Sequence, residues 1–288
     1  MKKNPDEIRI MVRERYGALA EGKVSSCGCG PGCTEDFPAE KSAAAEGAAA
    51  SGASSCCGGT STATLEQLGY TAEQAGAVPE GADLGLGCGS PLAFADARPG
   101  ETVLDLGSGA GIDAFLAARA VGPSGRVIGV DMTPAMLDRA RANAAREGFR
   151  NVEFRLGEIE HLPVADGTLD LIISNCVVNL SPEKAQVFRE AYRALRPGGR
   201  MLVSDLVLLE ALPEPVRASV EAYVGCVAGA SLREEYLGLI RAAGFTDVTV
   251  VRESRYGGDF AAPGASDEEQ ARAMRSVVSV AVRARRPA

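Results

Sequence analysis

The stretch Thr102-Val-Leu-Asp-Leu-Gly-Ser-Gly-Ala-Gly-Ile112 decides the fold of this 288-residue chain. Its first half is a short apolar run with one acidic interruption, which suits a buried parallel strand. Three glycines follow at alternating positions, and the apolar spacing of residues 112–119 predicts a helix. A strand, a glycine turn and a helix together place backbone amides and a helix N-terminus against a bound ligand.

The glycine spacing and one acidic residue indicate which nucleotide the turn serves. Nicotinamide and flavin enzymes use G-x-G-x-x-G with a pyrophosphate at the helix N-terminus, whereas Gly107, Gly109 and Gly111 form G-x-G-x-G. The carboxylate of Asp105 would repel a pyrophosphate but could accept a hydrogen bond from an ammonium group, which S-adenosylmethionine carries at its amino-acid end. The next predicted strand ends in Asp131, an acid that can bind ribose hydroxyls. A dehydrogenase turn or a purely structural glycine loop is the alternative.

Strands and helices alternate along the rest of the chain, which predicts a doubly wound, mostly parallel α/β sheet of seven strands. Thr133 and Pro134 are expected at the N-cap and first position of one helix. A helical insert is expected after the fifth strand. The predicted strands are 103–106, 126–131, 152–156, 169–174, 201–204, 248–252 and 276–283, and the predicted helices are 8–19, one within 65–78 capped by a Thr-x-Glu start at Thr71, 92–95, 112–119, one from 134, 182–195, 215–232 and 237–243.

Residues 22–64 are mostly Gly, Ala, Ser and Thr, and they carry five of the eight cysteines. Such a composition buries too little apolar surface to order itself, so we expect a flexible segment. The spacing from Cys27 through Cys29 to Cys33 is poor for a zinc knuckle. Neighbouring Cα atoms lie about 3.8 Å apart, below the roughly 4.4 Å that a disulfide needs, so Cys56 and Cys57 are not expected to pair with each other.

Composition limits the partners. The net charge of −8 and the pI near 5.0 argue against a nucleic-acid partner. No apolar run has the length of a membrane span, and the first residues lack the apolar core of a signal peptide. We therefore expect a cytoplasmic protein without a membrane partner, with its cysteines mostly reduced. A monomer is the expected state.

Several motifs resemble those of class I S-adenosylmethionine-dependent methyltransferases. They are the glycine turn 105–111, Asp131-Met132, Leu169-Asp-Leu-Ile-Ile-Ser-Asn175 and Leu195-Arg-Pro-Gly-Gly199.

Other motifs are more specific, and together they resemble the arsenite methyltransferases over most of the chain. They are Gly85-Leu-Gly-Cys-Gly-Ser-Pro91, Val130-Asp-Met-Thr-Pro134, Ser174-Asn-Cys-Val-Val-Asn-Leu180, Cys226 and Arg15-Tyr16-Gly17. The resemblance implies an N-terminal helix (1–21), a Cys-rich segment (22–64) and a methyltransferase domain (65–288) with an arsenic-binding insert around 206–245.

The resemblance also implies roles for individual residues. Cys88, Cys176 and Cys226 would be the thiolates that bind trivalent arsenic. An N-terminal cysteine would take part in a disulfide relay, in which Cys56 or Cys57 exchanges with Cys88. Cys27, Cys29 and Cys33 are alternative candidates for this cysteine. Thioredoxin or glutathione would be the reductant. Gly107 and Gly109 would contact the methionine end of the cofactor, Asp131 the ribose, and Met132 and Ile159 the adenine. The full predicted cofactor set is Asp105, Gly107, Ser108, Gly109, Gly111, Asp131, Met132, Glu158, Ile159 and Asn175.

Two features depart from the family pattern. Many relatives carry a paired tyrosine where this chain has Leu86-Gly87, and longer relatives carry an extra C-terminal domain with more cysteines. These departures concern the rate and extent of methylation rather than the type of reaction.

The position of Cys176 supports arsenic as the methyl acceptor. Cys176 follows the fourth strand, which is expected beside the first, so it should lie near the methyl end of the cofactor. Trivalent arsenic is soft and prefers thiolates, and its lone pair can attack a methyl group without losing a proton, so no general base is needed. Two alternatives remain: a methyltransferase for a carbon or oxygen acceptor such as a quinone or sterol, and a non-catalytic thiol-based metalloid-binding protein.

Overall fold

A single sheet in the order β3-β2-β1-β4-β5-β7-β6 forms the centre of the computed structural model, which describes residues 4–23, 62–256 and 262–288. The strands β1 to β5 pair in parallel, and β7 runs antiparallel between β5 and β6. The predicted doubly wound, mostly parallel seven-stranded fold is confirmed. The strands are β1 Thr102–Leu106, β2 Arg126–Asp131, β3 Val152–Leu156, β4 Leu169–Asn175, β5 Leu195–Leu208, β6 Thr246–Arg255 and β7 Val277–Arg285.

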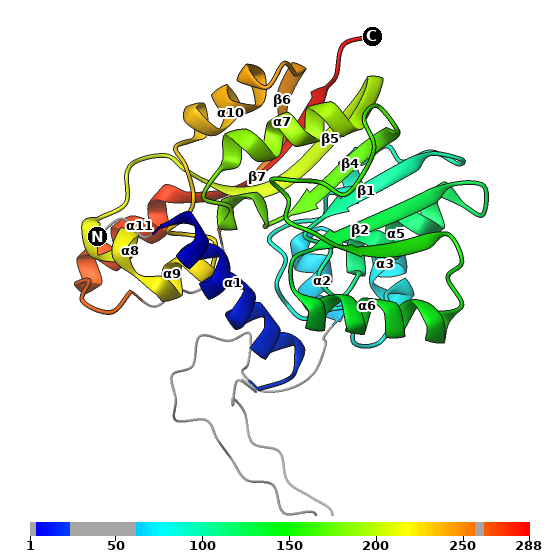
Figure 1. Ribbon diagram of the computed structural model, residues 1–288. Coiled ribbons are helices and arrows are strands. Elements are labelled where there is room, and N and C mark those ends of the chain that lie inside the picture. The colour runs from blue at the N-terminus through cyan, green and yellow to red at the C-terminus, as the bar shows by residue number, and fades with distance from the viewer. Residues whose placement is uncertain (1–3, 24–61, 257–261) are drawn as a thin grey trace, which may run out of the picture.

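Helices cover both faces of the sheet. In Figure 1, α2, α3, α5 and α6 lie on one face, α7 and α10 on the other, and α1, α8, α9 and α11 gather at one end. Two separate apolar cores match these layers, one between the sheet and α7 and α10, the other between the sheet and α5 and α6. The helices are α1 Pro5–Ala20, α2 Thr62–Leu68, α3 Ala72–Ala77, α4 Leu92–Ala95, α5 Ile112–Val121, α6 Pro134–Glu147, the 3₁₀ turn η1 Val178–Leu180, α7 Lys184–Ala194, α8 Glu214–Ala218, α9 Val220–Val224, α10 Arg233–Ala242 and α11 Asp267–Ser276.

The strand order creates a switch point between β1 and β4. From β1 the chain crosses to β2 and β3 on one side, whereas β4 and β5 lie on the other. Ligands of doubly wound sheets bind outside the carboxyl ends of the strands at such a point. The glycine turn after β1 and Cys176 after β4 are therefore brought to the same edge, as the sequence predicted for these two strands.

Local structure differs from expectation in several places. The strand expected at 201–204 extends over Leu195–Leu208, and the helix expected at 237–243 begins at Arg233. The segment 65–78 forms two helices, and the N3 partner of Thr71 in the capping box of α3 is Gln74 rather than Glu73. The insert 215–232 contains only the short helices α8 and α9, which Ser219 separates. Helix α11 was not predicted, although Ser266 and Glu269 form its capping box.

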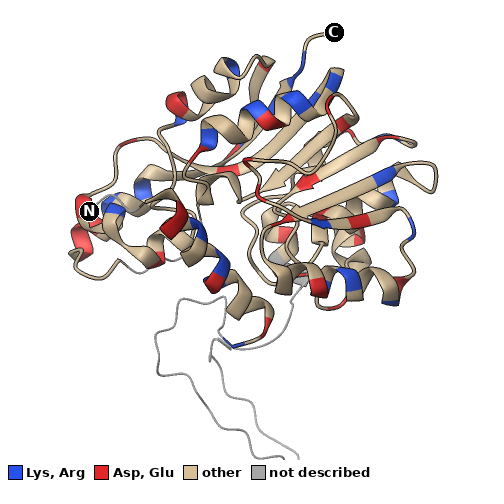
Figure 2. Cartoon of the chain, in the orientation of Figure 1, with Lys and Arg blue, Asp and Glu red and all other residues tan. Residues whose placement is uncertain are grey.

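Charged residues of both signs are scattered over the helices, loops and strands and form no block of a single sign (Figure 2). No helix among the described residues combines the length and the apolar character that crossing a bilayer would require. The cysteines expected in the disulfide relay, Cys56 and Cys57 with the alternatives Cys27, Cys29 and Cys33, lie outside the described residues.

Candidate active site

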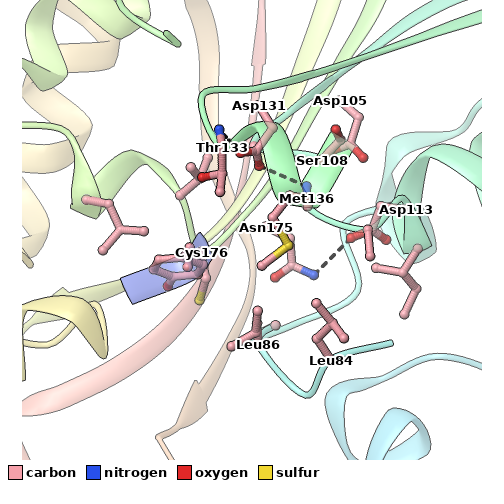
Figure 3. A pocket seen from close by; sticks show the side chains of 18 of the residues that line it. Leu84, Leu86, Asp105, Ser108, Asp113, Asp131, Thr133, Met136, Asn175 and Cys176 are labelled. Atoms are coloured by element: carbon pink, nitrogen blue, oxygen red, sulfur yellow. Dashed lines mark hydrogen bonds between the residues drawn. The ribbon is translucent and has the colours of Figure 1, made fainter. Parts of the chain in front are cut away.

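A cavity that is partly open to solvent lies at the carboxyl ends of β1, β2 and β4. Its walls include the glycine turn after β1, the ends of β2 and β4, the loop 82–87, parts of the segments 65–70, 157–160 and 177–181, and one side of helix α1. Figure 3 shows the labelled side chains of the turn, the strand ends and the loop around it. A concave site lined mainly by apolar side chains with a few polar groups is typical of a cofactor site.

The glycine turn shapes the floor of this cavity. Gly107 has a φ of +65°, and a Cβ at this position would collide with the side chain of Val177. The amide of Gly109 donates a hydrogen bond of 3.0 Å to Asp131 Oδ2, and the amide of Thr133 donates one of 2.8 Å to Asp131 Oδ1. The carboxylate that ends β2 is thereby fixed at the cavity wall, although its burial raises its pKa above the usual value.

Two further carboxylates lie beside the turn. Asp105 and Asp113 are both buried and both line the cavity. Burial, with Asp113 and Asp131 nearby, raises the pKa of Asp105 well above its usual value, and burial raises that of Asp113 to about 6. Asp105 Oδ2 and Ser108 Oγ are buried without a hydrogen-bond partner. Orphaned oxygens of this kind fit an ammonium group, so the residues present suit the amino-acid end of S-adenosylmethionine.

Asn175, at the end of β4, connects these acids with the loop that carries Cys88. Its Nδ2 group donates to Asp113 Oδ2 at 3.0 Å and to the carbonyl of Gly89 at 2.7 Å, and its Oδ1 accepts the amide of Cys88 at 3.1 Å. Tyr70 donates its hydroxyl to Asp113 Oδ1 at 2.9 Å. The dashed line in Figure 3 marks the bond between Asn175 and Asp113.

The three cysteines predicted to bind arsenic lie together. Cys88 and Cys176 are joined by a disulfide with a Cα–Cα distance of 5.8 Å, and the Cys226 thiol donates to the carbonyl of Cys176 at 3.0 Å. The sequence predicted free thiolates at Cys88 and Cys176, whereas the structure holds this pair in its oxidised form. The sulfurs of this pair and a carboxylate oxygen of Asp205 all lie within 4.8 Å of one another.

The surroundings of Cys226 act on its ionisation in opposite directions. Burial, with the charge of Asp205 nearby, raises the pKa of the Cys226 thiol, whereas a hydrogen bond from Tyr16 and the charge of Lys184 lower it. The Tyr16 hydroxyl also donates a hydrogen bond of 3.2 Å to the carbonyl of Val224. Helix α1 therefore contributes a side chain to the thiol cluster.

Most of the predicted cofactor residues line the cavity. Gly111 and Glu158 do not line it. Gly111 is the N-cap of α5, and Glu158 forms an ion pair of 3.6 Å with Arg9. The residues that do line it are Asp105, Gly107, Ser108, Gly109, Asp131, Met132, Ile159 and Asn175.

Sequence reasoning missed several lining residues. Asp113 directly follows the glycine turn at the start of α5, and that position could have indicated it. Tyr70, Arg9 and Val12 carried no comparable signal, because tertiary packing alone brings them to the cavity.

Comparison with known proteins shows the class first. Residues 97–244 match a family described as "Methyltransferase domain". With the switch-point cavity and its acidic glycine turn, this match defines a class I methyltransferase of the S-adenosylmethionine-dependent kind.

Closer relatives show the particular family. An arsenite methyltransferase of Halobacterium salinarum is 46% identical over 287 residues, which cover 99% of this chain and 68% of the relative. One of Aquipseudomonas alcaligenes is 45% identical over 174 residues, or 58% of this chain and 50% of that longer protein. The crystal structure of an arsenic(III) S-adenosylmethionine methyltransferase from Chlamydomonas reinhardtii aligns with a TM-score of 0.60 and 35% identity, covering 78% of this chain and 73% of that one. The chain belongs to the arsenite methyltransferase family, as its motifs predicted.

Proposed function

We propose that this chain transfers a methyl group from S-adenosylmethionine to trivalent arsenic held by the thiolates of Cys88, Cys176 and Cys226. One observation carries the proposal. Cys176 lies 88 residues after Cys88 in the sequence, and Cys226 lies 50 residues after Cys176. The fold nevertheless brings the three cysteines together at the cavity, where Cys176 lines the wall. The detoxification of arsenic as methylated arsenicals would be the result.

The cofactor supplies an electrophilic methyl group on a sulfonium. The chain's own residues would hold and orient it: Asp105 and Ser108 at the amino-acid end, and Asp131 at the ribose. The unpartnered oxygens of Asp105 and Ser108 support the first assignment. Met132 and Ile159, also on the cavity wall, would flank the adenine.

The thiols would bind arsenite by exchange. Each thiol proton leaves with an arsenic hydroxyl as water while a sulfur–arsenic bond forms, so the exchange releases no net proton. The lone pair of the pyramidal arsenic then forms the arsenic–carbon bond as the carbon–sulfur bond of the sulfonium breaks. Positioning of the two reactants at about 3–3.5 Å supplies the catalysis, and no general base is required.

A reducing step must follow, because the methylated product is formally pentavalent. Two electrons from a pair of cysteine thiols return arsenic to the trivalent state and leave a disulfide, which thioredoxin or glutathione would reduce. The proximity of Cys88 and Cys176 supports such a step, since these two sulfurs already pair. We propose that Cys56 or Cys57 relays the disulfide, and that the chain works as a monomer in the reducing cytoplasm.

Arsenic speciation tests the proposal. Wild type, reduced and incubated with arsenite, S-adenosylmethionine and glutathione, is expected to yield methylated arsenic on liquid chromatography, and Cys176→Ser is expected to yield none. S-adenosylhomocysteine binding by both proteins controls for folding.

The same assay separates the two alternatives. Methylation of a quinone or sterol by Cys176→Ala and Cys226→Ala at the wild-type rate would establish a carbon or oxygen acceptor. Tight arsenite binding by wild type without any methylated product would establish a sequestering protein.

A further inference from the structure

Tyr70 lies outside the matched methyltransferase domain, yet its hydroxyl reaches the cavity. The residue follows α2, and its ring packs in a small apolar cluster with Leu65, Ala75 and Leu116. Only 4% of its surface is exposed. Its position is therefore fixed by packing on α5, and its hydroxyl is the one polar atom it presents to the site.

The hydroxyl closes a ring of hydrogen bonds. Tyr70 donates to Asp113 Oδ1 at 2.9 Å, Asn175 Nδ2 donates to Asp113 Oδ2 at 3.0 Å, and the Tyr70 oxygen lies 3.1 Å from Asn175 Nδ2. Both carboxylate oxygens of Asp113 are thus engaged by donors that fix its orientation. Because its amino group faces Asp113, the amide of Asn175 must turn its oxygen the other way.

That oxygen holds the loop of Cys88. Asn175 Oδ1 accepts the backbone amide of Cys88 at 3.1 Å, while Nδ2 also donates to the carbonyl of Gly89 at 2.7 Å. A Cβ on Gly87 would lie 3.0 Å from Asn175 Nδ2, so the loop packs closely on this amide. One side chain therefore contacts both the cofactor acids and the arsenic-binding loop.

We propose that Tyr70 is a positioning residue that couples the two sites: it orients Asp113 and Asn175, so that occupation of the ammonium site by the cofactor orders the Cys88 loop for arsenic. The proposal rests on the proposed function for the arsenic half and on the geometry of the described residues for the cofactor half. It assigns a task to the segment before the methyltransferase core.

Charge explains why the network responds to the cofactor. Asp113 lies beside the buried carboxylate of Asp105, which in turn lies near Asp131, and it accepts the hydroxyl of Tyr70. A cationic ammonium group among these acids stabilises the ionised form of Asp113, which accepts from both Tyr70 and Asn175. A protonated Asp113 carries a donor on one oxygen, so it could no longer accept from both Tyr70 and Asn175.

The first experiment compares two ligands on Tyr70→Phe, which keeps the packed ring. S-adenosylhomocysteine carries the ammonium group, and 5′-methylthioadenosine lacks the amino-acid end. We expect the dissociation constant for S-adenosylhomocysteine, measured by titration calorimetry at pH 7.5, to rise about tenfold, and that for methylthioadenosine to stay within about twofold of wild type. The control is Tyr192→Phe, whose ring packs on Phe245 away from the cavity.

The pH dependence provides a readout that simple damage would not move. Affinity for S-adenosylhomocysteine should fall as the pH drops through the pKa of Asp113, which is about 6. The Tyr70 hydrogen bond lowers that pKa, so Tyr70→Phe should shift the midpoint to higher pH. Equal weakening of both ligands with an unmoved midpoint would mean that Tyr70 only supports the fold, and unchanged affinity for both would also overturn the proposal.

The second experiment measures the coupling itself. Protein reduced with a phosphine is titrated with arsenite with and without S-adenosylhomocysteine, and bound arsenic is counted after equilibrium dialysis. We expect the nucleoside to tighten arsenite binding about fivefold in wild type and Tyr192→Phe, and to leave it unchanged in Tyr70→Phe. A wild-type affinity that ignores the nucleoside would refute the coupling. Absence of any arsenite binding would instead refute the proposed function. In that case the comparison of S-adenosylhomocysteine with methylthioadenosine would still test whether Tyr70 orients the acids of the cofactor site.

Discussion

Two of the proposed arsenic ligands have left-handed backbone conformations, which side chains other than glycine rarely adopt. The φ angle is 55° at Cys176 and 65° at Cys226. Each costs about 1–2 kcal/mol relative to a right-handed conformation. Backbone hydrogen bonds hold both in place, from Cys176 to the carbonyl of Ser204 at 2.8 Å and from Cys226 to that of Tyr223 at 2.9 Å. Strain retained at two neighbouring thiols indicates that their direction matters for function.

The Tyr16 hydroxyl should set the reactivity of one of these thiols. Its hydrogen bond lowers the pKa of Cys226, which burial raises. We expect Tyr16→Phe to raise that pKa further and to slow the labelling of Cys226 by methyl methanethiosulfonate about fivefold at pH 8. Mass spectrometry of the reduced protein measures the rate.

The thiol prediction has an internal check. Both labelling rates should rise steeply with pH while the deficit of Tyr16→Phe stays the same, because below both pKa values each unit of pH raises the thiolate fraction by the same factor in the two proteins. Equal labelling rates in the two proteins would show that the hydroxyl does not act on the thiol. Arg13 lies exposed on the same helix, so the control variant Arg13→Ala should leave the labelling rate of Cys226 at the wild-type value.

At the scale of elements, α1 closes one side of the cavity, and Arg9 ties it to the rest of the chain through ion pairs. Arg9 forms ion pairs with Glu160 at 3.5 Å, with Glu158 at 3.6 Å and with Glu183, while Val12 and Tyr16 of the same helix line the wall. The Arg9 side chain is only 15% exposed, and Glu160 is almost fully buried. Loss of this cation would leave a buried carboxylate without its partner, which is costly.

We therefore expect Arg9→Ala to loosen α1 and weaken S-adenosylhomocysteine binding about five- to tenfold, mainly through faster dissociation. Stopped-flow or surface-plasmon kinetics would show this, with Arg13→Ala as the control from the exposed side of α1. Wild-type kinetics in Arg9→Ala would mean that the helix does not cover the bound cofactor.

Elements also show what the sequence could and could not predict. The unit from β1 to the end of β2 was predictable, because its pattern is local: an apolar run, alternating glycines and a terminal acid. The place of β7 between β5 and β6 depends on non-local pairing, which no local pattern records. The site divides in the same way, since motif residues such as Asp131 were predicted, whereas Tyr70 and Arg9 reach the cavity only through packing of the preceding helices.

On the scale of the whole molecule, buried carboxylates converge on the carboxyl edge of the sheet. Asp105, Asp113, Asp131 and Asp205 all have raised pKa values, chiefly because of burial. The value is about 6 for Asp113 and about 7 for Asp205. Three of these acids, Asp105, Asp113 and Asp131, line the cavity, so their burial lowers the stability of the fold at neutral pH but suits the site to a cation.

The pH dependence of stability follows from these shifts. A carboxyl group whose pKa is higher in the folded than in the unfolded chain binds more protons when folded, so it stabilises the fold most at low pH. That contribution is present near the unfolded pKa of about 4 and is lost as the pH rises through the folded values of about 6 and 7. We therefore expect the melting temperature of the ligand-free protein to fall by several degrees between pH 5 and pH 8.

S-adenosylhomocysteine should raise the melting temperature more at pH 8 than at pH 5, since its ammonium group stabilises the ionised acids. Methylthioadenosine, which lacks that group, should raise the melting temperature by a similar amount at both pH values. Scanning fluorimetry across this range decides the matter: a melting temperature that rises steadily to pH 8 would show that the buried acids are ionised at no cost to the fold.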